Sequence, residues 1–246
     1  MHLSRTARSV PPRALAGTLI VVLLAACSPG GAATGPRTSA PVPATATTAS
    51  SPGAAGGECE QASPRPTVSV PKATALASPP SEPASDGTTA TIVTELGDVT
   101  IELFSASAPV AATNFVNLAE AGFYQCVVFH RLVPGFVIQG GDPSGDGTGG
   151  PGYEIQDEPV VGTYARGIVA MARTQRPNSQ GSQFFIVLDD AAEPALERYR
   201  TYVIFGRVTN GMDVVDRIAA MPNSGEQTGN QALEPVAMKS VTIKRP

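Results

Sequence analysis

The chain has 246 residues, of which 15% are charged, and its formal net charge is -4 at pH 7. With that charge and no long basic patch, there is no reason to expect nucleic-acid binding. Proline (23 residues) and glycine (25 residues) are frequent and unevenly distributed, which predicts a mixture of irregular and folded regions.

Residues 1–26 are typical of a lipoprotein signal peptide. Three arginines precede the apolar run ALAGTLIVVLLAAC, which is shorter than the roughly 20 residues that span a bilayer. Its end, LAAC, resembles a bacterial lipobox, a signal in which cleavage before the cysteine is followed by lipidation of that cysteine. We therefore expect Cys27 to anchor the protein to the cell membrane, outside the cytoplasm. The alternative is an ordinary signal peptide that is cut nearby, with Cys27 incidental.

Residues 27–87 are expected to form a disordered linker. Stretches such as SAPVPATATTASSPGAAGG and ASPPSEPASDG contain almost no large apolar side chains. Such a composition buries too little apolar surface to offset the entropy lost on ordering. The remaining residues, 88–246, are sufficient for one folded domain with a substantial core.

The folded domain begins with strand signals. TATIVTEL and VTIELF alternate polar and apolar residues, and Gly97-Asp98 between them is a tight-turn signal. A helix is expected to begin near Pro109, a good first-turn residue, and to stop at Gly122. Later short apolar runs predict five further strands, at 127–132, 135–140, 167–172, 183–188 and 202–208.

A second helix is expected from about Asn210, acting as its N-cap, to Ala220, and a last strand at 238–244. Many short strands with only two helices favour a closed β-barrel, because closure removes exposed sheet edges.

The stretch FHRLVPGFVIQGGDP, at 129–143, places polar side chains inside an apolar run. Arg131 keeps its proton and cannot be a general base, and Gln139 is not a nucleophile. His130 points to the opposite face of the strand from Arg131 and is interpreted as a core residue. No catalytic Ser-His-Asp set is evident.

Metal chemistry is not expected, and neither is a cofactor. Cys59 and Cys126 are far apart, and the chain has no CxxC spacing and no His-x-x-His pair. The stretch GGDPSGDGTGGPG lacks both Gly-Lys-Ser/Thr and the ligand spacing of an EF-hand, so it is interpreted as a surface loop. With Cys27 lipidated, Cys59 and Cys126 are the two cysteines left in an oxidising compartment, and they are candidates for a disulfide.

Arg131 supplies a fixed cation and Gln139 a side-chain amide, with phenylalanines nearby. Such a set suits a ligand that has an apolar ring attached to a polarised peptide bond. A prolyl peptide bond fits that description. Its rotation barrier is about 18–20 kcal/mol because the nitrogen lone pair is delocalised into the carbonyl. A hydrogen bond donated to that nitrogen forms best in the twisted state, so it stabilises the transition state.

Three segments resemble, in order, the signatures of cyclophilin-type peptidyl-prolyl cis–trans isomerases: FHRLVPGFVIQGGDP, GIVAMARTQRPNSQGSQFFIVL and YVIFGRV. The similarity covers about residues 90 to 246. It implies a mainly β fold, a closed eight-stranded antiparallel β-barrel capped by two α-helices. It also implies isomerase activity on Pro-containing polypeptides without a cofactor.

The resemblance implies that Arg131 is the catalytic guanidinium and that Gln139 acts with it. It implies substrate-binding roles for Phe136, Val137, Ala172, Arg173, Gln183, Phe185, Leu196 and Tyr202. Strand alternation points Phe184 away from Phe185 and into the core. The chain has no tryptophan, and Ala195 lies near the position where many members have one, which weakens the expectation of tight cyclosporin binding.

The resulting hypothesis is a monomeric, lipid-anchored isomerase that acts on X-Pro bonds of exported proteins and assists their folding. One alternative is a proline-segment binding module or holdase with negligible catalysis. Another is a structural envelope lipoprotein, which explains the anchor but not the site.

Overall fold

The computed structural model describes Cys59 and residues 64–246, all within one compact unit, Gly53–Pro246. The predicted signal peptide 1–26, the lipidation site Cys27 and the rest of the predicted linker before residue 64, apart from Cys59, lie outside the described residues.

Nine strands form one antiparallel sheet, in the order β8-β3-β4-β6-β5-β7-β2-β1-β9. They are β1 (Thr89–Thr94), β2 (Gly97–Leu103), β3 (Val127–Val133), β4 (Val137–Asp142), β5 (Ile168–Met171), β6 (Phe184–Val187), β7 (Ile204–Asn210), β8 (Ala237–Met238) and β9 (Ser240–Lys244). The α-helices are α1 (Pro109–Glu120), α2 (Glu193–Glu197) and α3 (Met212–Ala219). Short 3-10 helices, η1 (Asp190–Ala192) and η2 (Glu226–Thr228), complete the regular elements of the described chain.

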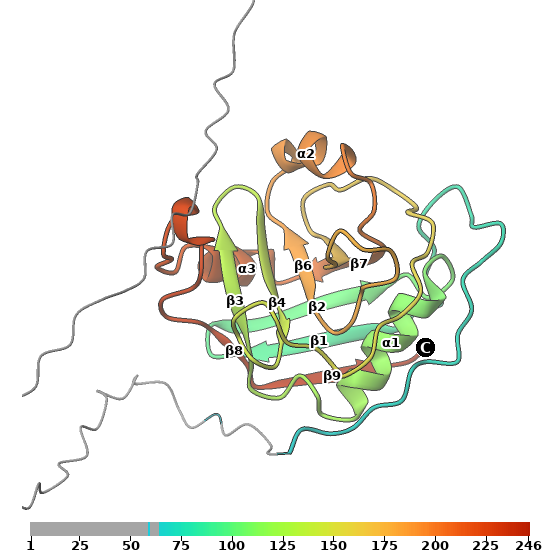
Figure 1. Cartoon of the computed structure of the whole chain (residues 1–246), viewed down its shortest axis with the longest axis horizontal. Helices are drawn as coiled ribbons and strands as arrows, with labels where there is room; N and C mark the ends of the chain where they lie inside the picture. Colours follow the sequence, from blue (N-terminus) through green and yellow to red (C-terminus); the bar gives the residue numbers. More distant parts are fainter. Residues whose placement is uncertain (1–58, 60–63) are drawn as a thin grey trace, which may run out of the picture. The chain divides into compact units, whose positions relative to one another are not determined.

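The sheet curls into a nearly closed barrel (Figure 1). Its two edge strands, β8 and β9, are separated by Lys239 alone, whose N–H donates to the carbonyl of Val93 in β1 at 2.8 Å. The predicted mainly β barrel is confirmed. Lys239 belongs to neither strand and separates the two-residue β8 from β9, so the strand count is nine instead of eight.

The first hairpin turns at Glu95-Leu96, so the predicted turn at Gly97-Asp98 was wrong by two residues. Thr94 pairs directly with Gly97, which is already the first residue of β2. The hydroxyl of Thr94 closes the turn: it donates to the carbonyl of Gly97 at 2.7 Å and accepts from the N–H of Leu96 at 3.1 Å.

Helix α1 begins at Pro109 as predicted, and Gly122 follows its C-cap with φ of +74°. The N–H groups of Gly122 and Phe123 donate to the carbonyls of Ala119 and Leu118, both at 2.9 Å. This is a Schellman ending, which requires a left-handed residue where Gly122 stands.

Helix α3 begins at Met212, and the prediction that Asn210 caps it was wrong. Asn210 ends β7, where it pairs with Thr100. Gly211 takes the N-cap position with φ of +91°, and a Cβ at that position would lie 2.2 Å from the carbonyl oxygen of Asp98. Only glycine fits this close approach between α3 and the first hairpin.

The barrel interior is filled by apolar side chains from the sheet and from α1. Phe184 is fully buried at its centre, as predicted. Its ring makes an edge contact with the ring of Phe115 of α1 at 5.5 Å and another with that of Phe205 of β7 at 6.5 Å. These aromatic contacts join both sides of the barrel across its core.

Residues 64–87, here called the strap, run along the outside of the barrel before β1 (Figure 1). Val68, Ala73 and Ala75 pack against the edge of the core. Further along, the carbonyl of Ala84 accepts from the N–H of Ala106 at 3.1 Å. These apolar contacts and hydrogen bonds connect the strap, which is the last part of the predicted linker, to the barrel.

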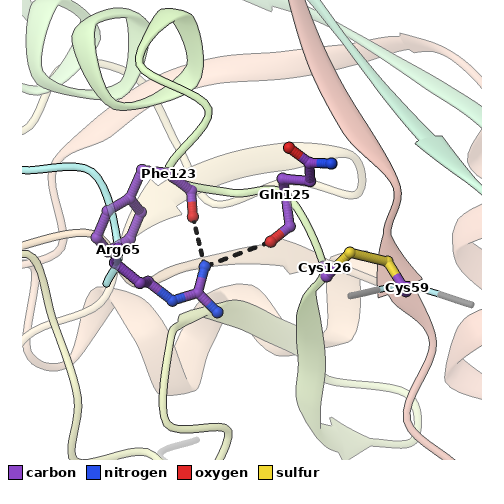
Figure 2. The surroundings of a disulfide bond; sticks show 5 residues. All are labelled: Cys59, Arg65, Phe123, Gln125 and Cys126. Carbon is purple, nitrogen blue, oxygen red and sulfur yellow. Dashed lines mark hydrogen bonds between the residues drawn. A yellow bond between two sulfur atoms is a disulfide. The ribbon is translucent and has the colours of Figure 1, made fainter. Parts of the chain in front are cut away.

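A disulfide joins Cys59 to Cys126, with Cα atoms 5.4 Å apart, at the residue before β3 (Figure 2). Next to it, Arg65 of the strap donates to the carbonyls of Phe123 and Gln125, at 2.8 and 3.3 Å. The guanidinium of Arg65 also lies over the ring of Phe123, 5.8 Å from its centroid. The beginning of the strap thus contacts the barrel through Arg65, and Cys59 just before it is bonded to the barrel covalently.

Candidate active site

A pocket of about 370 Å³ contains every predicted site residue of the barrel except Gln183. It is lined by Arg131, Phe136, Val137, Gln139, Ala172, Arg173, Phe185, Ala195, Leu196, Tyr199 and Tyr202. The strands β3, β4 and β6 supply one wall, and α2 with the residues after it supplies another.

Three of the lining residues form a row across neighbouring strands. Arg131 of β3 pairs with Gln139 of β4, which pairs in turn with Phe185 of β6. Paired residues of antiparallel strands project to the same face, so the three side chains gather on the face opposite Phe184 and the barrel core. Strand register alone therefore places a cation, an amide and an aromatic ring together.

A chain of hydrogen bonds orients the arginine. Arg131 Nη1 donates to Gln139 Oε1 at 3.3 Å, and Gln139 Nε2 donates to Gln183 Oε1 at 2.9 Å. Gln183 Nε2 then donates to the carbonyls of Gly147 and Gly149, at 3.0 and 2.9 Å. Gln183 therefore lies behind Gln139 and connects the pocket to the glycine-rich loop.

Asp142 holds that loop in shape. Its side chain is 1% exposed, and its carboxylate accepts from the N–H groups of Ser144, Asp146 and Gly147 at 2.7, 3.2 and 2.5 Å. A Cβ at Gly149 would lie 2.1 Å from Asp142 Oδ1, so the loop closes tightly around the carboxylate. The stretch interpreted as a surface loop from its composition is thus also the support of Gln183.

Arg131 is half-buried, and burial lowers its pKa, while Tyr202 opposes that shift. A guanidinium nevertheless remains protonated in proteins. Within the described chain no carboxylate forms an ion pair with Arg131. Its charge and its remaining N–H donors are therefore available to a bound substrate.

The aromatic side of the pocket is formed by Phe185 and Tyr202, whose rings meet edge to face at 5.4 Å. Tyr164, which the sequence reading missed, holds Tyr202 in place. Its hydroxyl donates to the carbonyl of Tyr202 at 2.8 Å and accepts the N–H of Tyr202 at 3.2 Å. Burial raises the pKa of Tyr164, so the hydroxyl stays neutral and can do both. No local signal could identify a contact 38 residues away.

A second, larger pocket of about 630 Å³ adjoins the first and shares Gln139, Ala172 and Arg173 with it. The Arg173 guanidinium forms an ion pair with Asp157 at 2.8 Å and donates to the carbonyl of Arg176 at 2.7 Å. Arg173 thus lies at the junction between the two pockets, with its positive charge neutralised by Asp157.

His130 of β3 is 4% exposed, and its Nε2 lies close to Gly147 of the glycine-rich loop, 3.9 Å from where a Cβ would stand. Its pKa is lowered mainly by burial, which Asp142 opposes. Across residues 64–246 and Cys59, no group of three or more His, Cys, Asp or Glu side chains is placed to hold a metal ion. The same residues include no helix that is both long and apolar enough to cross a bilayer.

Residues 89–243 match the family model described as "Cyclophilin type peptidyl-prolyl cis-trans isomerase/CLD". The chain belongs to the cyclophilin family.

Individual relatives agree with this assignment. A peptidyl-prolyl cis-trans isomerase of Helicobacter pylori is 44% identical over 133 residues, which are 52% of this chain and 78% of that protein. One from Acinetobacter baylyi is 41% identical over 158 residues, 61% of this chain and 82% of the relative. The peptidyl-prolyl cis-trans isomerase-like 1 of Aspergillus niger is 43% identical over 138 residues, 54% and 82% of the two chains.

A solved cyclophilin from Cryptosporidium parvum has a similar fold, with a TM-score of 0.58 and 34% identity. The match covers 64% of this chain and 99% of that one, which was crystallised in the presence of the dipeptide Ala-Pro. The present cyclophilin is accordingly a peptidyl-prolyl cis–trans isomerase.

Ala195, which was expected near the position where many members have tryptophan, lines the cavity. Leu196 and Tyr202 line it too. So does Tyr199, a residue that the sequence did not single out.

Proposed function

We propose that Arg131 is the group that lowers the rotation barrier of X-Pro bonds in this cyclophilin, and that its substrates are exported proteins. The observation that carries the first part is the hydrogen-bond chain from Gly147 through Gln183 and Gln139, which orients the guanidinium beside an apolar pocket. The pocket of Phe136, Phe185 and the neighbouring apolar residues suits the ring of a proline.

In this mechanism the proline ring enters the pocket and the peptide bond before it lies next to Arg131. As the bond twists, the nitrogen lone pair leaves conjugation with the carbonyl and becomes a hydrogen-bond acceptor. An N–H of Arg131 donates to it, and this interaction is strong only in the twisted state. No proton is transferred and no covalent bond is broken. Preorganisation by Gln139 means that the donor does not have to be oriented during the reaction.

The test is Arg131→Ala in the chain without its first 27 residues. Loss of one preorganised donor is expected to lower kcat/KM about 10²–10³-fold, which is about 3–4 kcal/mol. Peptide binding, measured by NMR titration, should change little, because the donor acts mainly in the transition state. Arg131→Lys should restore little activity, since an ammonium cannot reproduce the planar fork held by Gln139.

If a folded Arg131→Ala protein isomerised X-Pro bonds at near the parental rate, the assignment to Arg131 would be wrong. If the parent bound Pro-containing peptides but accelerated no isomerisation, the binding-module alternative would replace the proposal. The melting profile of each variant is the control for folding.

Two features support a site of action outside the cytoplasm. The first is the Cys59–Cys126 disulfide, because disulfides persist mainly in oxidising compartments. The second is the lipobox-like LAAC sequence ending at Cys27. Lipidation of Cys27 with more than one acyl chain would give stable membrane anchoring. The enzyme would then act, as a monomer on a tether, on proteins that fold after export.

Cys27→Ala tests the anchor. In a bacterial host with lipoprotein processing, the variant should move from the membrane fraction to the soluble fraction, or remain unprocessed. Its isomerase domain should keep the parental kcat/KM, because every residue that lines the described pocket is unchanged. A Cys27→Ala protein that is processed normally and stays fully in the membrane fraction would contradict the proposal.

A further inference from the structure

An exposed aromatic side chain lies at the edge of the proline pocket. Tyr199 lines that pocket, yet it is 64% exposed. Among the described residues the other large apolar side chains with comparable exposure are Val70 and Leu233, and neither lines this pocket. Aromatic side chains commonly line ligand pockets, and a tyrosine at the edge of one can pack on a ligand while its hydroxyl stays in water.

The turn that carries Tyr199 is held firmly. The N–H groups of Tyr199 and Arg200 both donate to the carbonyl of Leu196, at 3.2 and 3.0 Å. Arg200 has a φ of +36°, which is unfavourable for a residue with a side chain. Its guanidinium binds the Glu197 carboxylate at 2.7 and 2.6 Å, which restrains this backbone conformation.

The same guanidinium also reaches another part of the chain. Arg200 Nη2 donates to the carbonyls of Val160 and Gly162, at 3.3 and 3.2 Å. The turn is therefore tied to a segment about 40 residues earlier, as well as to α2. A turn fixed at both sides presents Tyr199 with little backbone entropy left to lose when a ligand binds.

The other aromatic residues of this region are already paired. Tyr202 packs edge to face on Phe185 and its ring lies 6.5 Å from that of Tyr164. Within the described part of the chain, Tyr199 has no ring–ring contact, and its hydroxyl has no hydrogen bond. Nothing in the described fold therefore uses the Tyr199 side chain, and its free face is available to substrate.

We propose that Tyr199 is a specificity residue: it packs on an aromatic or long apolar side chain next to the substrate proline. This inference rests on the proposed proline pocket around Arg131. The second pocket shares Gln139, Ala172 and Arg173 with the first but does not include Tyr199. We therefore expect Tyr199 to contact the substrate residue that extends from the proline pocket toward α2, away from the second pocket.

The expected size of the effect follows from aromatic pairing. A ring–ring contact adds about 0.5–1.5 kcal/mol beyond area burial, which corresponds to a preference of about two- to tenfold. Tyr199→Phe should keep this preference, because the ring does the packing, whereas Tyr199→Ala should lose it.

The experiment uses two pairs of short peptides around one proline. In the first pair the residue before proline is Phe or Ala, and in the second pair the residue after it is Phe or Ala. Isomerisation is followed by NMR exchange, and the readout is the Phe/Ala ratio of kcat/KM within each pair. The parent should prefer Phe in one pair, and Tyr199→Ala should reduce that ratio about two- to tenfold. Leu233→Ala, which removes an equally exposed apolar side chain outside the pocket, is the matched control and should leave every ratio unchanged.

Unchanged Phe/Ala ratios in both pairs for Tyr199→Ala would overturn the inference. So would an equal loss on the Phe and Ala peptides, which would mean that Tyr199 only supports the pocket. The Phe/Ala ratio of kcat/KM does not depend on whether Arg131 is the catalytic group. The proposal for Arg131 is tested separately, by the absolute kcat/KM on the alanine peptides.

Discussion

Phe184 and Phe185 are consecutive residues of β6 with separate tasks. Phe184 faces the barrel core and is fully buried among the rings from α1 and β7. Phe185 faces the proline pocket, where its ring meets that of Tyr202. Because side chains alternate across a strand, one dipeptide contributes to both stability and binding.

Matched substitutions should separate the two tasks. Phe184→Leu is expected to lower the free energy of unfolding by about 1–2 kcal/mol, since it leaves part of a packed core unfilled, with little change in KM. Phe185→Leu is expected to weaken peptide binding by about 1 kcal/mol, roughly fivefold, through loss of aromatic packing. Urea unfolding and steady-state kinetics measure the two effects. A larger KM change for Phe184→Leu than for Phe185→Leu would contradict this division.

At the scale of elements, the loop after β4 supports the hydrogen-bond chain that orients Arg131. Its shape depends on the Asp142 carboxylate, and its carbonyls hold Gln183, which is two hydrogen bonds away from Arg131. Asp142 does not line the pocket, so we predict that it acts on catalysis only by positioning Gln183 and, through it, Arg131.

Asp142→Asn should therefore reduce kcat while leaving KM nearly unchanged. The new amide group places a donor against backbone N–H groups of the loop, so the loop shifts and Gln183 loses its carbonyl partners. Small misplacements of this kind lower rates by about tenfold or more. Asp146→Asn is the matched control, because that side chain is exposed and bonds within the loop, where it accepts from Thr148. Steady-state kinetics well below the unfolding temperature give the readout, and parental kcat for Asp142→Asn would rule out this role.

At the scale of the whole molecule, the disulfide connects Cys59, which precedes the strap, to Cys126, the residue before β3. The bond joins cysteines 67 residues apart, and a loop of that size predicts a stabilisation of about 4 kcal/mol from chain entropy. The pocket contains no residue of the strap, so this stabilisation should be independent of catalysis.

The double variant Cys59→Ser with Cys126→Ser should show reduced stability and normal chemistry. We expect a lower melting temperature and faster proteolytic cleavage within residues 64–87, because the strap is then held only by weak contacts such as those of Arg65. The kcat/KM on a test peptide should remain within about twofold of the parent, as its catalytic groups are untouched. Parental melting and cleavage rates would show that the disulfide contributes little.

The sequence by itself determined the barrel, the course of α1 and most of the pocket. Alternation with a period of two separates Phe184 from Phe185, and Pro109 and Gly122 bound α1, because these signals depend only on the backbone conformation of adjacent residues. The family resemblance named Arg131 and Gln139, which strand register then brings together.

Only the tertiary structure decided how these residues are supported, because those contacts join segments that no local pattern relates. Ala108 offers α1 no side-chain cap, and Glu158 supplies one from 48 residues away by accepting the N–H of Val110 at 2.9 Å. Tyr164 reaches Tyr202 in the same way across 38 residues. The strap has the composition expected of a linker, yet its apolar side chains contact the barrel, and such contacts offset part of the entropy lost on ordering. The disulfide of Cys59, just before the strap, restricts the same part of the chain.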